Sequence, residues 1–366
     1  MRRVWIVVLA VLGVVLIAAA ISLPTWVSSQ FIKFPLSVNE TAVLDASNAS
    51  YFSATTLKPV TGVTIQASYA IKGDPAKGSS SVAVWDETSN VEDITNHRVI
   101  EQTTRVLAFD RRTGQLVDCC GANVNGNASV RQTGLAGYVF PFGTQKQTYE
   151  VFNTTLNRPL PFVYTGTATV GGITTYEFVE NVPSTQFATQ EIPGSLIGLT
   201  TPIVRAPLFD QEHVIYYVDP ETGALLNVNN QQTVTLHNPS TGAQALVLYD
   251  ADLTVTPASL SQVIALDSSG RNEITLIETT LPLIFGIVGG IAVLAAAFLT
   301  LRRPKRRDDM AELDDVPLER PRTATDQSQA HRAAELAAVA PALDDPPRDL
   351  AAEAPDPDAP DPSPGE

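Results

Sequence analysis

The chain is poor in the residues that most metal sites and many enzymes need. Its 366 residues include two cysteines and four histidines, and none of these has the spacing of a zinc site. A glycine-rich phosphate loop is absent, and residues 194–198 miss the Gly-x-Ser-x-Gly nucleophile pattern by one position. We therefore name no catalytic residue, no metal ligand and no cofactor, and we predict that the protein is not an enzyme.

Positive charge is also scarce in the middle of the chain. Residues 24–301 carry 13 basic and 23 acidic side chains, which gives a net charge of −10. Nucleic acids and anionic membrane surfaces attract a basic stripe or patch, and this part of the chain has neither. The composition therefore predicts no nucleic-acid partner.

Long apolar runs occur near the N-terminus and toward the C-terminus. Residues 4–23 follow two arginines, and residues 281–301 precede a block with five basic residues. Each run is long enough to cross a hydrocarbon core of about 30 Å as a helix, and basic flanks stay in the cytoplasm. We therefore predict a two-pass plasma-membrane protein whose residues 1–3 and 302–366 are cytoplasmic and whose main domain is extracytoplasmic.

The first run has a second interpretation. Two arginines, an apolar stretch and the small residues 18–20 also fit a signal peptide that is cleaved. The apolar run continues beyond the small residues to Leu23, which favours an uncleaved anchor. Both interpretations stay open from the sequence.

Residues 24–256 have the composition of an antiparallel β domain. Threonine, valine, tyrosine and isoleucine are frequent, and turn residues recur at short intervals. Gly171 and Gly172 separate two alternating segments, 164–169 and 174–179, which predicts a hairpin. The predicted fold class is mainly β, a large antiparallel β ectodomain between an N-terminal and a C-terminal transmembrane helix.

One short unit occurs twice in this domain. Residues 106–117 match residues 215–226, and both contain an Asp-x-x-Thr-Gly sequence between two predicted strands. The aspartate can accept hydrogen bonds from the turn, and the glycine can take the positive φ that ends it. We interpret Asp110 and Asp219 as turn residues.

The segments on either side of the second apolar run differ sharply. Thr256 and Pro257 favour a helix start, so residues 257–280 are predicted to form a helical stalk that Gly270 interrupts or bends. Residues 302–366 are rich in alanine, proline and acidic residues, which is typical of a disordered acidic tail. A cytoplasmic partner for this tail cannot be named from the sequence.

The two cysteines, Cys119 and Cys120, are adjacent. An oxidising exterior makes free thiols the less usual state, and neighbouring cysteines can close a strained ring. Flanking turn residues such as Gly121 and Gly126 would tolerate the kink. A vicinal disulfide, a bridge between two chains and a pair of free thiols all remain open.

The order of these parts resembles a family of two-pass actinobacterial envelope proteins of unknown function, labelled PorA-type porin. The resemblance covers about residues 1–305 and rests on both apolar runs and on residues 109–114, 137–143, 148–149, 164–178 and 218–223. It implies a cell-envelope location and supplies no catalytic residues. The plan also looks like the CD36 class, in which a β domain with two anchors holds a lipid tunnel.

Two functions follow as hypotheses. The first is a membrane-tethered, non-enzymatic β domain that binds or passes envelope lipids, with membrane lipids as partners and apolar runs such as 192–203 lining a cavity. The alternative is a subunit of an oligomeric porin-like channel, which requires a homo-oligomer because two helices cannot line a pore alone.

Overall fold

The computed structural model describes residues 2–302, within which eleven strands form one antiparallel sheet. The strand order is β5-β4-β3-β2-β1-β11-β10-β9-β8-β7-β6, so the first half of the domain (β1–β5) joins the second half (β6–β11) through the β1–β11 pair. The strands are β1 Asn39–Ser53, β2 Lys58–Gly73, β3 Val82–Asp93, β4 Arg98–Asp110, β5 Asn123–Val124, β6 Tyr149–Asn153, β7 Arg158–Val170, β8 Ile173–Pro193, β9 Ile203–Val218, β10 Leu225–His237 and β11 Gln244–Val255.

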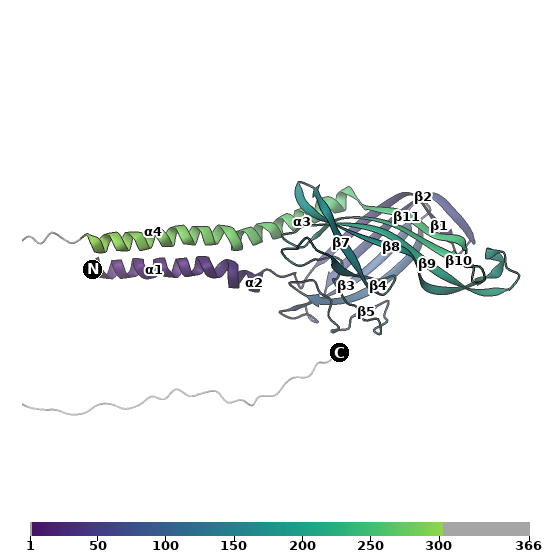
Figure 1. Ribbon diagram of the computed structural model, residues 1–366, viewed down its shortest axis with the longest axis horizontal. Helices are drawn as coiled ribbons and strands as arrows, with labels where there is room; N and C mark the ends of the chain where they lie inside the picture. Colours follow the sequence, from purple (N-terminus) through teal and green to yellow (C-terminus); the bar gives the residue numbers. More distant parts are fainter. Residues whose placement is uncertain (1, 303–366) are drawn as a thin grey trace, which may run out of the picture. The chain divides into compact units, whose positions relative to one another are not determined.

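The sheet curls so that its two edges approach each other (Figure 1). Leu135 joins them, because it forms bridges with Gln115, which follows β4, and with Val151 on β6. Buried apolar side chains fill the inside of the curl in several clusters, which draw on both halves. The prediction of a large antiparallel β domain is confirmed.

Two helical segments extend from the same end of the β domain (Figure 1). The first comprises α1 Arg2–Ser22, a π-helical turn at Leu23–Val27 and α2 Ser28–Phe31. The second comprises α3 Pro257–Thr275, a π-helical turn at Leu276–Thr280 and α4 Leu281–Leu301. Both contain stretches long and apolar enough to cross a membrane, and their large apolar side chains are mostly exposed.

The helix boundaries correct the sequence prediction at two places. The first helical segment continues to Phe31 rather than ending near Leu23, and Pro24, which lacks an N–H, lies in the π-helical turn that joins α1 to α2. Gly270 does not interrupt the stalk, since α3 continues past it and the irregular turn comes later, at Leu276–Thr280. The predicted cap is confirmed, because Thr256 accepts a hydrogen bond from the Ser259 backbone.

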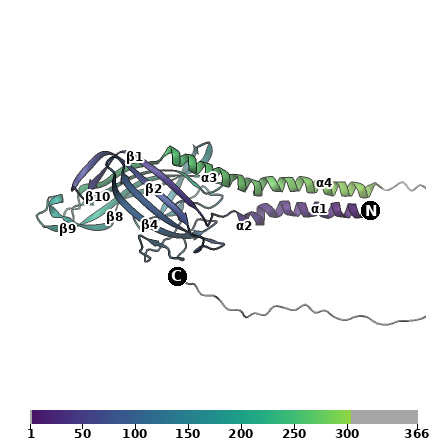
Figure 2. The same cartoon turned by 180° about the vertical axis from the view of Figure 1, so that it is seen from behind.

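α1 and α4 pack side by side, as both views show (Figures 1 and 2). Two glycines allow the close approach. A Cβ at Gly13 would lie 2.8 Å from the Gly289 carbonyl oxygen, and one at Gly289 would lie 2.9 Å from the Gly13 carbonyl oxygen. Small residues at such a crossing are typical of helices that associate within a membrane.

The structure also bears on the predicted hairpin and on the apolar run 192–203. The hairpin at Gly171–Gly172 is confirmed as the β7–β8 turn. The run 192–203 does not line either pocket described below: Ile192 packs with Ala206 and Leu236, while Ile203 is 64% exposed. The predicted acidic tail lies outside the described residues.

Candidate functional site

The repeated turns lie at the end of the sheet that carries the helices. Each follows a strand that runs toward this end, β4 for the turn Asp110–Gly114 and β9 for the turn Asp219–Gly223. In both, the glycine N–H donates to the aspartate backbone carbonyl, and the aspartate carboxylate accepts from the turn. The prediction that both aspartates build turns is confirmed, and each turn also holds one helical segment.

The first turn holds the linker that follows α2. Arg111 donates from its backbone to Ser81, accepts from the Phe34 N–H at 2.7 Å, and donates from Nε to the Phe34 carbonyl at 2.7 Å. The Phe34 ring stacks on Phe142 with centroids 4.5 Å apart and contacts Phe109 edge-on. These contacts fix the chain as it leaves the first helical segment.

The second turn holds α3. The Arg271 guanidinium bonds both carboxylate oxygens of Asp219, at 2.8 and 2.7 Å, and contacts Glu221 at 2.9 Å. Thr222 donates its hydroxyl to both Asp219 and Asp267. Burial, together with a smaller effect of the nearby Asp219, raises the pKa of the Asp267 carboxyl to about 7, although Thr222 and Arg271 oppose the shift. The stalk is therefore bonded to the sheet and is not a free linker.

A bridging segment, residues 134–143, connects the two turns. Its backbone donates to Gly114 from Ala136 and to Gly223 from Phe140. Both glycines have positive φ, and a Cβ would lie 2.7 Å from the Val139 oxygen at Gly114 and 2.1 Å from the Phe140 oxygen at Gly223. Only glycine fits at these two positions, because a side chain there would be strained and would displace the bridging segment.

A pocket of about 230 Å³ opens where the helical segments meet the turns. We call it the junction pocket. Ile32, Phe142 and Ile274 give it apolar walls, and it is completed by Ser28, Arg112, Gly143, Glu221 and Glu278. Its lining therefore comes from both helical segments, from both repeated turns and from the bridging segment.

The first half of the sheet buries an ion pair inside the curl. Arg105 on β4 lies 3.6 Å from Glu87 on β3, donates to Gln132 and Ala136, and stacks over Phe152. Burial raises the pKa of Glu87, and Arg105 and Tyr138 partly offset this. Within the part of the chain that the structure describes, Nη2 of Arg105 and Oε2 of Glu87 have no hydrogen-bond partner.

The second half buries an acidic cluster, Glu180 on β8 with Asp210 and Glu212 on β9. Gln232 donates to Asp210 at 2.9 Å and to Glu212 at 2.8 Å, and Asn153 donates to Glu212 at 3.0 Å. Among residues 2–302, Glu180 Oε1 has no hydrogen-bond partner, and the carboxyl groups of Asp210 and Glu212 form a hydrogen bond with each other. Burial and then repulsion from Asp210 raise the pKa of Glu180 to about 7 and that of Glu212 to about 9. The raised pKa values favour the protonated forms of Glu212 and, in part, of Glu180 near neutral pH, which lowers the negative charge of the cluster.

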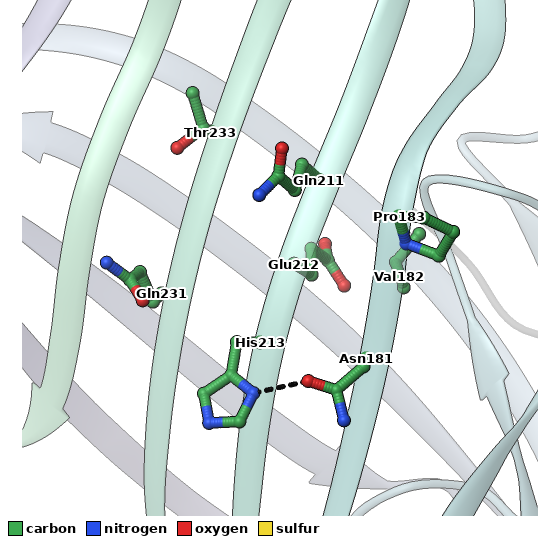
Figure 3. Close-up of a pocket in the computed structure, with 8 residues that line it drawn as sticks. All are labelled: Asn181, Val182, Pro183, Gln211, Glu212, His213, Gln231 and Thr233. Atoms are coloured by element: carbon green, nitrogen blue, oxygen red, sulfur yellow. Dashed lines mark hydrogen bonds between the residues drawn. The ribbon is translucent and has the colours of Figure 1, made fainter.

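A second pocket, of about 340 Å³, lies on β8, β9 and β10 and includes Glu212 of this cluster in its lining (Figure 3). We call it the outer pocket. Its lining combines polar side chains with Val182 and Pro183, and Nδ1 of His213 lies 2.6 Å from Oδ1 of Asn181. The β8–β9 register shifts between Val182 and Thr185, next to Pro183. A lone histidine beside an amide offers no nucleophile or acid–base pair, because Glu212 alternates to the other face of its strand.

The remaining residues considered from the sequence stay apart. Cys119 and Cys120 lie in the loop between β4 and β5, with their Sγ atoms 2.27 Å apart and Cys120 at φ +62°. The vicinal disulfide stays a prediction. His97 is in the β3–β4 turn and His237 stacks on Phe209. In residues 2–302, no group of three or more histidine, cysteine, aspartate or glutamate side chains could hold a metal ion.

Sequence reasoning missed the buried charges. Arg271 and Asp267 lie on one side of a stalk that was interpreted only by its apolar residues. Asp210 and Glu212 have the same strand parity as Val214 and Val218, which are buried, so alternation along β9 could have placed them inside. Alternation along β4 likewise places Arg105 on the face of the buried Leu107 and Phe109, but it does not reveal the partners of Arg105, which come from other segments.

Comparison with known proteins agrees with this architecture. No curated protein matches the chain. The family model described as Porin PorA matches residues 7–298, which include both helical segments, both repeated turns and the whole sheet. The resemblance inferred from the sequence is thus confirmed, and the chain belongs to the PorA family.

Proposed function

We propose that this membrane protein is a tethered, non-enzymatic β domain that binds cell-envelope lipids at the junction pocket. The observation that carries the proposal is the position of this pocket, directly beyond the ends of two apolar helices and lined by both. In the proposed topology α1 and α4 cross the plasma membrane, both termini are cytoplasmic, and residues 24–256 lie outside with residues 257–280 as the stalk.

The level of the pocket along the helices fits a lipid headgroup. Glu278 precedes Leu281 by three residues, and Ser28 follows Leu23 by five, which correspond to about 4.5 and 7.5 Å along a helix. The headgroup layer extends roughly 5–7 Å beyond the hydrocarbon core on each side. Trp26 and Phe31, 67% and 71% exposed, lie at the same level, where aromatic side chains anchor proteins at the interface.

The inside of the curl supports binding at the surface rather than transport through an internal tunnel. Packed apolar clusters and buried ionisable groups fill it. Large apolar side chains exposed on the strands are few, Val99, Val163, Ile203 and Val247. A sheet with so little apolar outer surface is suited to water on its outer face.

Lipid retention tests the proposal. The full chain is purified in mild detergent, and the lipids that survive detergent exchange are counted by native mass spectrometry. Ile32→Asp places a charge in the apolar wall and should lower retention about tenfold, whereas the matched Val99→Asp, on an exposed strand, should retain lipid normally. Equal retention in the two variants, or no retained lipid in the wild type, would overturn the proposal.

The family supports a second candidate, a subunit of an oligomeric channel. The buried acidic cluster favours it, because a polar interior is what a conducting path needs. Reconstitution of the full chain in planar bilayers decides this candidate: cation-selective conductance that Glu212→Gln reduces would support it, and the absence of conductance counts against it.

A further inference from the structure

The charges at the rim of the junction pocket restrict which headgroup it can accept. Arg112 and Glu278 both line the pocket, and within residues 2–302 neither side chain makes an ion pair or a side-chain hydrogen bond. The third charge, Glu221, is already paired with Arg271 at 2.9 Å. One cation and one anion therefore remain for a ligand.

Charge balance then favours a ligand that carries both signs. An anionic headgroup would satisfy Arg112 but bring a second negative charge toward Glu278. A purely cationic group would satisfy Glu278 but bring a second positive charge toward Arg112. Asp110 and Asp219 belong to the two turns beside the pocket but do not line it, and their carboxylates already accept bonds from the turns and from Arg271. Arg112 attracts Asp110 electrostatically, without an ion pair between them. These aspartates add no donor or acceptor for the ligand.

Resting on the proposed function, we infer that the junction pocket selects a zwitterionic aminophospholipid. Its phosphate is bound by Arg112, its primary ammonium group is bound by Glu278, and the upper acyl carbons lie against Ile32 and Ile274. Arginine suits the phosphate because its planar donors match two oxygens at once, and a primary ammonium can donate directly to a carboxylate. The acidic character of the domain, net −10 over residues 24–301, is consistent with the rejection of anionic lipids.

The test uses the full chain in nanodiscs that contain equal amounts of phosphatidylethanolamine, phosphatidylcholine and phosphatidylglycerol, followed by native mass spectrometry of retained lipid. The wild type should retain phosphatidylethanolamine several-fold over both others, since phosphatidylcholine cannot donate from its ammonium group. Arg112→Gln should lower phosphatidylethanolamine retention about tenfold, which corresponds to one lost charge-assisted hydrogen bond.

Glu278→Gln gives the diagnostic result. Without the carboxylate, Arg112 faces the ligand alone, so the preference should change from phosphatidylethanolamine to phosphatidylglycerol. Arg98→Gln and Glu150→Gln remove the same charges from exposed strand positions and should leave the lipid ratios unchanged.

Two failures can be told apart. Retained lipid that responds to Ile32→Asp but shows no headgroup preference, or a preference unaffected by both pocket variants, overturns this inference and leaves lipid binding intact. Absence of retained lipid in the wild type overturns the proposed function itself.

Discussion

The two halves of the sheet bury acidic side chains in different ways. In the first half Glu87 faces Arg105 at 3.6 Å, whereas in the second half no basic side chain among residues 2–302 pairs with Glu180, Asp210 or Glu212. The amides of Gln232 and Asn153 donate to Asp210 and Glu212 instead. In the repeated turns it is the second half that pairs its aspartate with an arginine, because Asp219 is fully buried and bonded to Arg271. Among the described residues, the Asp110 carboxylate of the first half accepts hydrogen bonds from its own turn only. A shared local sequence thus fixes the turn, while the distant partner decides how charge is balanced.

The largest loss of stability is predicted for a substitution in the second turn. Asp219→Ala leaves Arg271 with Glu221 alone and removes the turn bonds, which should cost about 3 kcal/mol of unfolding free energy. Asp110→Ala, which loses only partly exposed turn bonds, should cost about 1 kcal/mol. Thermal unfolding of the purified full chain measures both, and equal losses would contradict the asymmetry.

A pH series tests the charge balance of the two halves. A carboxyl whose pKa is raised on folding stabilises the folded state at low pH, and this contribution is lost as pH rises through the folded pKa. The pKa of Glu180 is raised to about 7 and that of Glu212 to about 9, against an ordinary value of 4.5. The free energy of unfolding should therefore fall by roughly 2 kcal/mol or more from pH 5 to pH 9.

Variants separate this effect from other titrations. Glu212→Gln should flatten the decline and make the protein more stable than wild type at pH 9, whereas Glu150→Gln, at an exposed position on β6, should follow the wild-type curve. A wild-type stability that rises between pH 5 and pH 9 would contradict the raised pKa values of Glu180 and Glu212.

The contact between the two helical segments sharpens the comparison, because each half of the sheet holds one of them. Gly289→Leu would collide with Gly13, Leu16 and Ile17 and should cost about 1.5 kcal/mol. Gly290→Leu, which meets open space, is the matched control. Spin labels near the start of α1 and the end of α4 should move apart only in Gly289→Leu; the same distance in both variants would exclude the glycine crossing.

The smallest loss of stability is predicted for the loop between β4 and β5, which carries the two cysteines. A vicinal disulfide predicts that an alkylating reagent labels Cys119 and Cys120 only after reduction, and that replacing both by serine costs about 1 kcal/mol or less. Mass spectrometry of the intact chain measures the labelling. Two labels without reductant would show free thiols.

Much of the architecture could be predicted because it depends on local pattern. Apolar runs predicted the two long helices, alternation predicted strands, and the Gly171–Gly172 pair predicted a hairpin. The turn role of Asp110 and Asp219 followed from their spacing to threonine and glycine. Each of these signals lies within a few residues of the element that it specifies.

The junction pocket could not be predicted in this way. Its residues come from segments more than 240 positions apart, such as Ser28 and Glu278, and only the docking of α3 on the second turn brings them together. An interruption of the stalk at Gly270 is not found, for a related reason. A glycine lowers helix propensity, but side-chain bonds of Asp267 and Arg271 to the sheet hold the helix on either side of it.

Photo-crosslinking to lipid tests the central claim most directly. A photoreactive amino acid replaces Ile32 in the junction pocket or Thr233 in the outer pocket, and the full chain is irradiated in native membranes. The account predicts lipid adducts at position 32 and none at position 233, as read by mass spectrometry of the peptides. Adducts at position 233 alone, or at neither position, would contradict lipid binding at the junction of the two membrane anchors.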